Sequence, residues 1–144
     1  GVGGRMDTLQ CAIVLAKMTC FDDEILARQR AGQYYDKLFM KNDIRHVVQR
    51  IDRTSVFAQY TLQLENRDLV QETLKDAGVP TSIHYPVPLH RQPAYQKYCE
   101  ATSMPIASEV SSKVLSLPMH PYIDQRTQED IARLVISSEG KCPS

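Results

Sequence analysis

The chain has 144 residues, of which 42% are hydrophobic and 24% charged, a composition typical of a globular domain with one core. Its 17 basic and 17 acidic side chains cancel, so charge gives no reason to expect nucleic acid or an anionic membrane as a partner. No apolar run approaches the roughly 20 residues that span a bilayer, and the start lacks the pattern of a signal peptide. The four cysteines form no C-x-x-C pair, which predicts reduced thiols in a cytoplasmic protein.

The first expected element is a long helix over residues 5–40, because apolar side chains recur there at spacings of three and four. The segment CAIVLA at 11–16 is apolar all round, so we expect it to be buried on more than one side. FDDE at 21–24 offers a place for a kink, with Asp22 as the cap of a second helix. A helix of about 35 residues often links domains or joins subunits, and residues 1–42 are therefore expected to form a linking or dimerisation region.

A small sheet is expected to follow. Residues 54–64 alternate between apolar and polar side chains, which predicts a half-buried antiparallel strand, and a weaker strand precedes it near 46–51. Asn66 is a good N-cap for the next helix, and Gly78 is a good residue to end it. A further strand is expected at 81–85.

The rest of the chain alternates between loop, helix and strand. The expected elements are a proline-rich loop at 86–104, a short helix at 107–113, a short strand at 114–119 and a last helix capped by Asp124 or Thr127. Residues 43–144 are therefore expected to form a small two-layer α+β domain, with helices on one face of a mostly antiparallel sheet.

The stretch HYPVPLHRQPAY at 84–95 concentrates residues that carry chemistry. No metal is expected there, because His84, His90 and Cys99 lack the short paired spacings of zinc ligands. No serine or cysteine has the setting of a nucleophile such as G-x-S-x-G. The prolines stiffen the loop, and a stiff loop that bears His, Tyr and Arg can be either a structural connection or the wall of a binding site. The residues alone leave both interpretations open.

Three stretches together resemble one family. GRMDTLQCAIVLAKM at 4–18, GVPTSIHYPVPLHRQPAY at 78–95 and VLSLPMHPYID at 114–124 are similar, in order and spacing, to signatures of the DegT/StrS-type sugar aminotransferases. The variant with HYP, PLH and LPMHP looks most like the enzymes that aminate a UDP-linked 3-keto-N-acetylhexuronic sugar for bacterial lipopolysaccharide O-antigen. The resemblance implies a homodimer with the type I aminotransferase fold, a pyridoxal phosphate (PLP) cofactor and glutamate as amino donor.

In this family PLP forms an imine with a lysine of a large N-terminal domain. No lysine of this chain matches that motif, so the resemblance implies the last third of such an enzyme, with no catalytic residue of its own and no transamination when alone. The alternative is a stand-alone binding or oligomerisation module from a truncated or mobile gene.

The resemblance also assigns residues near the start of the chain. Gly3 and Gly4 match the region where the family's loop approaches the cofactor phosphate of the partner subunit, so only backbone amides can contact it here. Arg5 matches the arginine that faces anionic substrate groups, and its planar fork suits a carboxylate or a phosphate.

The other assigned residues lie in the proline-rich stretch. His84 and Tyr85 match the segment that borders the sugar pocket, and His90 is a further candidate for its rim. The resemblance therefore favours the binding-site interpretation of this loop.

Overall fold

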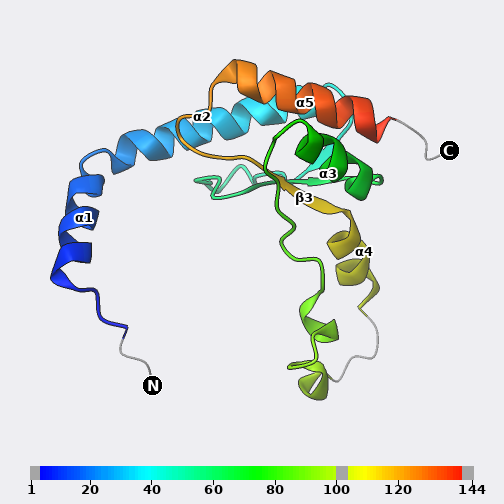
Figure 1. Cartoon of the computed structure of the whole chain (residues 1–144), viewed down its shortest axis with the longest axis horizontal. Coiled ribbons are helices and arrows are strands. Elements are labelled where there is room, and N and C mark those ends of the chain that lie inside the picture. The colour runs from blue at the N-terminus through cyan, green and yellow to red at the C-terminus, as the bar shows by residue number, and fades with distance from the viewer. Residues whose placement is uncertain (1–3, 100–103, 141–144) are drawn as a thin grey trace.

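The expected long N-terminal helix is divided into two in the computed structural model, which describes residues 4–99 and 104–140. α1 (Thr8–Met18) ends at a turn in which the hydroxyl of Thr19 donates a hydrogen bond to the carbonyl of Ala16. α2 (Phe21–Met40) then starts in a new direction (Figure 1). The predicted kink is confirmed, and it lies at Thr19 and Cys20, directly before the FDDE segment.

The two helices start in different ways. Asp7 caps α1 through a capping box, in which its carboxylate accepts from the amide of Gln10 while the Gln10 side chain accepts from the amide of Asp7. The N-cap position of α2 is Cys20, which makes no side-chain cap bond, so the expectation of Asp22 as the cap is wrong. Asp22 lies in the first turn instead, where its charge interacts favourably with the helix dipole.

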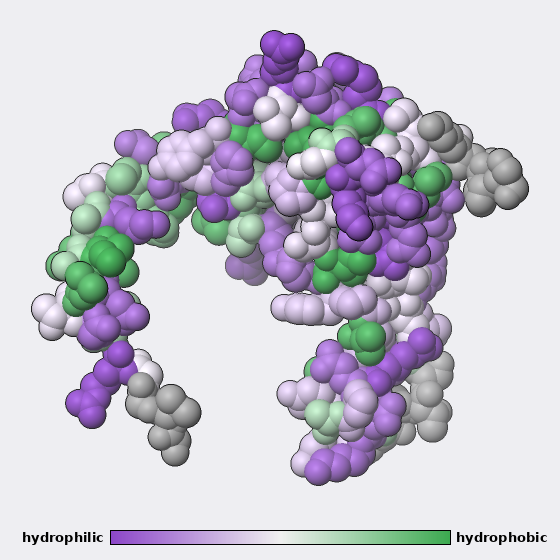
Figure 2. Space-filling view, viewed as in Figure 1, coloured by the Kyte–Doolittle hydropathy of each residue, from purple (hydrophilic) through white to green (hydrophobic). Residues whose placement is uncertain are grey.

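α1 buries none of its side chains within this chain. Leu9 is 72% exposed and Leu15 is 67% exposed. Figure 2 shows hydrophobic residues on the surface of this arm. The expectation that CAIVLA is buried on more than one side is therefore not met here, because α1 projects away from the core (Figure 1).

The sheet contains three short antiparallel strands in the order β1-β2-β3. They are β1 (Arg45–His46), β2 (Tyr60–Gln63) and β3 (Val114–Leu117). In the register of β2 with β3, Thr61 lies opposite Ser116.

The predicted strand at 54–64 is regular only in its last part, because the backbone breaks at Phe57. Phe57 has a positive φ of 44°, which reverses the alternation. Its ring is buried, whereas Val56, which strict alternation would place on the same face as the buried Tyr60, is 47% exposed. The ring packs against Gly32 of α2, so this segment contacts the helix instead of extending the sheet.

The strand expected at 81–85 is reduced to one bridge. Ser82 pairs with Ser116 through backbone hydrogen bonds of 3.1 and 2.7 Å, and the chain then leaves the sheet. Pro86 and Pro88 have no amide hydrogen, so the chain that follows cannot resume a regular ladder.

Helices cover one face of the sheet, and Figure 1 shows α2 and α5 (Gln125–Glu139) side by side above it. Gln128 of α5 is buried and donates a 2.8 Å hydrogen bond to the carbonyl of Ala31 in α2. The described part of the chain also contains α3 (Arg67–Asp76) and α4 (Pro105–Lys113), with 3₁₀ turns at Leu89–Arg91 and Gln96–Tyr98.

The predicted helix signals near α3 and α5 are mostly confirmed. Asp124 caps α5 by accepting a 2.8 Å hydrogen bond from the amide of Thr127. Gly78 follows α3 with a φ of 75°, a left-handed conformation that suits glycine. Asn66 occupies the N-cap position of α3 but makes no side-chain cap bond.

The core lies between the helices and the sheet. The rings of Tyr35 and Tyr60 are 4.8 Å apart at its centre, and Phe39 stacks on both. The rest of the core is mostly aliphatic and comes from α3, β2 and the residue that follows it, β3 and α5: Leu62, Leu64, Val70, Leu74, Leu115, Leu117, Ile131 and Val135. The predicted two-layer α+β fold is confirmed.

Candidate functional site

The proline-rich loop folds back toward α4, and a cavity of 560 Å³ lies between them. Its lining is mostly apolar and comes from both segments. The polar groups come from His84, Tyr85, Gln92 and Ser111. Apolar walls with a few polar groups are typical of a site for a small organic ligand.

His84 and Tyr85 lie together in this wall. Their rings meet edge to face, with centroids 5.5 Å apart, and the peptide bond between them is cis. His84 is half-buried, and its Nδ1 lies 3.4 Å from the hydroxyl of Ser116. Tyr85 is 70% exposed, so its phenol is free to contact a ligand. The structure therefore brings together the two residues that the sequence assigned to a sugar pocket.

His90 has a different position. It lies in the 3₁₀ turn of the loop and does not line the cavity. Its Nε2 is 3.4 Å from the hydroxyl of Ser108 in α4. His90 therefore links the loop to α4 outside the cavity lining.

The residues assigned near the N-terminus lie on the other arm. Gly3 falls outside the described residues, and Gly4 and Arg5 are exposed ahead of α1. Figure 1 shows that α1 and the proline-rich loop hang from opposite ends of the core. One copy of the chain therefore does not bring Arg5 and His84 into one site.

The lining of this cavity and the nearby Lys113 do not fit the imine bond that PLP forms with a lysine. No lysine lines the cavity that contains His84. Lys113, at the end of α4, donates to the carboxylates of Glu65 and Glu109 at 2.8 and 2.9 Å. These hydrogen bonds, that of Glu65 first, raise the pKa of Lys113, whereas an imine-forming lysine needs a lowered pKa.

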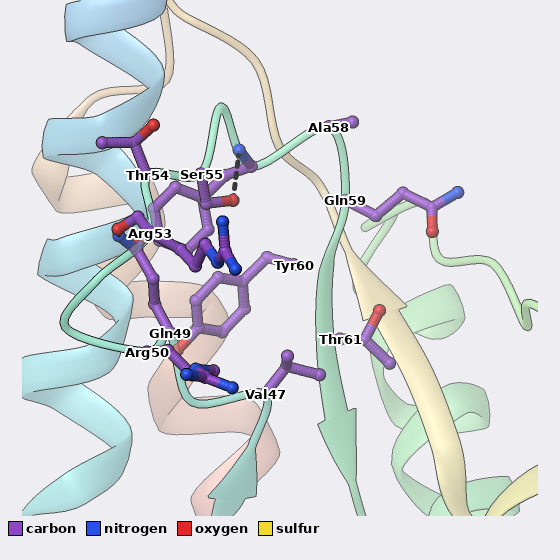
Figure 3. A pocket seen from close by; sticks show the side chains of 11 residues that line it. Val47, Gln49, Arg50, Arg53, Thr54, Ser55, Ala58, Gln59, Tyr60 and Thr61 are labelled. Atoms are coloured by element: carbon purple, nitrogen blue, oxygen red, sulfur yellow. Dashed lines mark hydrogen bonds between the residues drawn. The ribbon is translucent and has the colours of Figure 1, made fainter.

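A second cavity, of 450 Å³, lies beside β2 (Figure 3). Arg50, Arg53 and the ring of Tyr60 lie on the same side of the strand in this view. Asp52 accepts hydrogen bonds of 2.9 and 3.0 Å from Arg50, and its carboxylate is 3.7 Å from Nε of Arg53. Because Asp52 already pairs with Arg50, the cavity has less free positive charge than two arginines suggest.

The sequence did not single out these arginines. The only available signal was the segment RIDR before a strand, and a short run of charges is common on exposed loops. Among residues 4–99 and 104–140, no three His, Cys, Asp or Glu side chains gather where they could hold a metal ion. No helix in the same ranges is long and apolar enough to cross a membrane.

The family follows from a comparison with protein-family models. The model of the DegT/DnrJ/EryC1/StrS aminotransferase family matches residues 1–136. The chain belongs to this family. DegT/DnrJ/EryC1/StrS proteins are PLP-dependent aminotransferases, and the resemblance seen in the three sequence stretches is confirmed.

Individual members of the DegT/DnrJ/EryC1/StrS family give the same result. The UDP-2-acetamido-2-deoxy-3-oxo-D-glucuronate aminotransferase of Pseudomonas aeruginosa is 44% identical over 124 residues, which are 86% of this chain and 34% of the relative. The UDP-N-acetyl-3-dehydro-alpha-D-glucosamine 3-aminotransferase of Acidithiobacillus ferrooxidans is 31% identical over 137 residues, 93% of this chain and 35% of the relative.

A solved structure confirms the fold. The crystal structure of a DegT DnrJ EryC1 StrS aminotransferase from Brucella abortus superposes with a TM-score of 0.89 and 34% identity, covering 98% of this chain and 38% of that chain. The chain thus spans about a third of the length of the curated relatives that it matches.

Proposed function

We propose that this chain is the C-terminal part of a PLP-dependent aminotransferase. The complete enzyme transfers an amino group from glutamate to the keto carbon of a UDP-linked N-acetylhexuronic sugar used for lipopolysaccharide O-antigen. The observation that carries the proposal is the 44% identity to the Pseudomonas relative, which is named for a UDP-linked 3-oxo-glucuronate. The relative from Acidithiobacillus is also named for a UDP-linked 3-dehydro sugar, which supports this substrate class.

The part played by this chain is to bind and orient the sugar. The phenol of Tyr85 and the imidazole of His84 provide hydrogen-bonding groups at the wall of a mostly apolar cavity. Sugar hydroxyl and carboxylate oxygens need such partners, and the apolar lining excludes competing water. His90 supports the rim through its link to α4.

PLP supplies the electron sink for transamination when it is bound in the complete enzyme. We propose that its lysine lies outside this chain, and that the chain alone is inactive. Gly3 and Gly4 then provide backbone amides for the cofactor phosphate of a second subunit, and Arg5 provides a charged fork for an anionic substrate group. Because Arg5 and His84 lie on opposite arms, pairing of two copies through residues 1–42 is the arrangement that we propose, with residues 43–144 as the small domain.

A cytoplasmic location is part of the same proposal. Cys11, Cys20 and Cys99 are free thiols, which supports a reducing compartment.

The test is a fusion in which this chain replaces the matched 34% of the Pseudomonas relative. The folded fusion is expected to show the absorbance of the PLP imine and to aminate a UDP-linked 3-keto-hexuronic sugar in the presence of glutamate. The unmodified relative is the positive control, and this chain alone, which should show neither property, is the negative control. A fusion that forms the imine but aminates no such sugar would contradict the proposed substrate.

A second candidate function, a stand-alone oligomerisation module, is favoured by the exposed apolar side chains of α1. An apolar surface of this kind marks an interaction site. In sedimentation experiments on the chain alone, self-association that is lost when Leu9 and Ile13 are both changed to Glu would support an assembly role for α1. A monomer at all concentrations would exclude the module, whereas the fusion experiment would still test the aminotransferase.

A further inference from the structure

Three polar side chains form a connected row next to the cavity. Oγ1 of Thr61 in β2 is 2.9 Å from Oγ of Ser116 in β3, and Oγ of Ser116 is 3.4 Å from Nδ1 of His84. Figure 3 shows the side chain of Thr61 pointing toward β3, on the other side of β2 from the ring of Tyr60. The row therefore crosses the sheet from β2 to the residue that lines the cavity.

The backbone fixes the positions of all three residues. Thr61 and Ser116 are direct partners in the antiparallel register. Ser116 also pairs with Ser82 through two backbone hydrogen bonds, and this bridge holds the start of the segment that brings Nδ1 of His84 to within 3.4 Å of the Ser116 hydroxyl. Ser116 is only 5% exposed, so water does not compete freely for its hydroxyl.

The direction of the hydrogen bonds follows from the number of hydrogens. Each hydroxyl has one hydrogen to donate. If Thr61 donates to Ser116, and Ser116 donates to Nδ1 of His84, both hydrogens have an acceptor. In the reverse direction, Nδ1 of His84 would donate to Ser116 and Ser116 would donate to Thr61, so that the hydrogen of half-buried Thr61 would have water, and no group among the described residues, as its acceptor.

We propose that Ser116, oriented by Thr61, is a positioning residue that keeps neutral His84 in the tautomer with hydrogen on Nε2. Nε2 has no hydrogen-bond partner within the described part of the chain, and the ring lines the cavity. His84 therefore presents an N–H donor that matches an oxygen acceptor of a ligand, such as a carboxylate oxygen of a uronic acid. The identity of that ligand rests on the proposed function, whereas the tautomer does not.

The experiment measures the imidazole ¹⁵N chemical shifts of this chain by long-range ¹H–¹⁵N NMR, about two pH units above the ordinary histidine pKa of about 6.5. The exposed imidazole of His120 serves as an internal reference for a freely exchanging ring. In the native chain, the ¹⁵N chemical shift of Nδ1 in His84 is expected to be that of an unprotonated nitrogen. The difference between the Nδ1 and Nε2 chemical shifts should be larger in His84 than in His120.

Two substitutions test the row. Ser116→Ala should reduce the difference between the Nδ1 and Nε2 chemical shifts of His84 to the value found in His120. Thr61→Val, which keeps the shape of the side chain but removes the hydroxyl, should reduce this difference in part. Thr61→Ser, which keeps the hydroxyl, should leave the chemical shifts of His84 as in the native chain. The chemical shifts of His90 should not change in any variant. Amide spectra confirm that each variant folds.

A hydrogen on Nδ1 of His84 in the native chain, or a chemical-shift difference that Ser116→Ala leaves unchanged, overturns the proposal. A chemical-shift difference that Thr61→Val leaves unchanged overturns the role of Thr61. Adding UDP-glucuronic acid as a probe should then move the Nε2 resonance in the native chain and less in Ser116→Ala. If the tautomer is as proposed but the probe has no effect, the positioning role stands and the proposed substrate class fails.

Discussion

The ring of Phe57 occupies the space that a side chain at position 32 would need. A Cβ atom added to Gly32 would lie 2.6 Å from atoms of this ring, closer than real contacts allow. Gly32 is in the middle of α2, where glycine costs a helix about 1 kcal/mol relative to alanine. The close packing of the loop before β2 therefore explains a residue that weakens the helix.

Gly32→Ala is expected to destabilise the chain by about 1–2 kcal/mol, although alanine is the better helix former. Overpacking costs about 1–3 kcal/mol, which exceeds the gain in helix propensity. The measurement is the free energy of unfolding in urea. In the double variant with Phe57→Leu, the additional cost of the alanine should largely disappear. A stabilised Gly32→Ala variant would show that Phe57 does not pack against α2 in solution.

The buried tyrosines predict a loss of stability at alkaline pH. Burial raises the pKa of Tyr35 and Tyr60 far above 10, and for Tyr60 the hydrogen bond to Asp36 adds to the effect. A raised pKa in the folded state means that the stability is complete below the unfolded pKa of about 10 and is lost as pH rises above it. The loss should be at most about 1.4 kcal/mol per pH unit for each tyrosine.

Urea unfolding at several pH values between 8 and about 11 checks this expectation. Tyr60→Phe should reduce the slope above pH 10, since one of the two ionising groups is removed. Tyr98→Phe is the matched control, because Tyr98 is 72% exposed. Equal slopes for native chain and Tyr60→Phe would contradict the burial of this phenol.

Glu139 at the end of α5 is predicted to stabilise the start of α3. Its carboxylate accepts hydrogen bonds of 2.7 and 3.1 Å from the amides of Glu65 and Asn66. Glu139→Ala should lower the free energy of unfolding by about 1–3 kcal/mol, because two amides lose a charged acceptor. Glu139→Gln, which keeps one acceptor oxygen, should lose less. Glu72→Ala removes an equal charge from the exposed face of α3 and should change stability by less than about 0.5 kcal/mol.

Substitutions in the cavity wall are predicted to affect sugar use and not cofactor binding. In the fusion enzyme, His84→Ala and Tyr85→Phe should raise KM for the UDP-sugar about tenfold, the effect of losing about 1.4 kcal/mol of binding energy. The absorbance of the PLP imine should stay the same. Tyr98→Phe, in the same loop but outside the cavity lining, should behave like the unmodified fusion. Loss of the PLP signal before any change in KM would show that the wall contacts the cofactor.

The fold class was predictable because local signals and burial agree over most of the chain. The apolar stripe of α3, the left-handed Gly78 and the cap at Asp124 each specify an element without help from distant residues. The division between α1 and α2 was visible as a possible kink for the same reason. The exposure of α1 within this chain was not predictable, because it depends on what covers this helix and not on its own pattern.

The departures arise where tertiary packing overrides the local pattern. Alternation placed Val56 inside and Phe57 outside, but the larger ring gains more from packing against Gly32, and the backbone turns to allow it. The segment 81–85 likewise has the composition of a strand but forms only one bridge, at Ser82, and Pro86 and Pro88 keep the chain from pairing again beyond it.

The candidate site was predictable only through family resemblance. Spacing alone left His84 and Tyr85 open to structural or binding roles, and the structure places both at the cavity wall. Ser116 gave no sequence signal, because its role depends on a register between strands 55 residues apart. The functional roles of His84, Tyr85 and Arg5 stay predictions until the fusion is measured.

The proline-rich loop and α4 enter and leave the core at neighbouring points. The entering end is held by Ser82 against Ser116, and at the leaving end the carbonyl of Lys113 accepts a 2.9 Å hydrogen bond from the amide of Leu64. Both ends of this part of the chain are thus attached to the sheet. We therefore expect substitutions at the cavity-lining positions between them to alter the cavity wall while the buried layers beneath keep their packing.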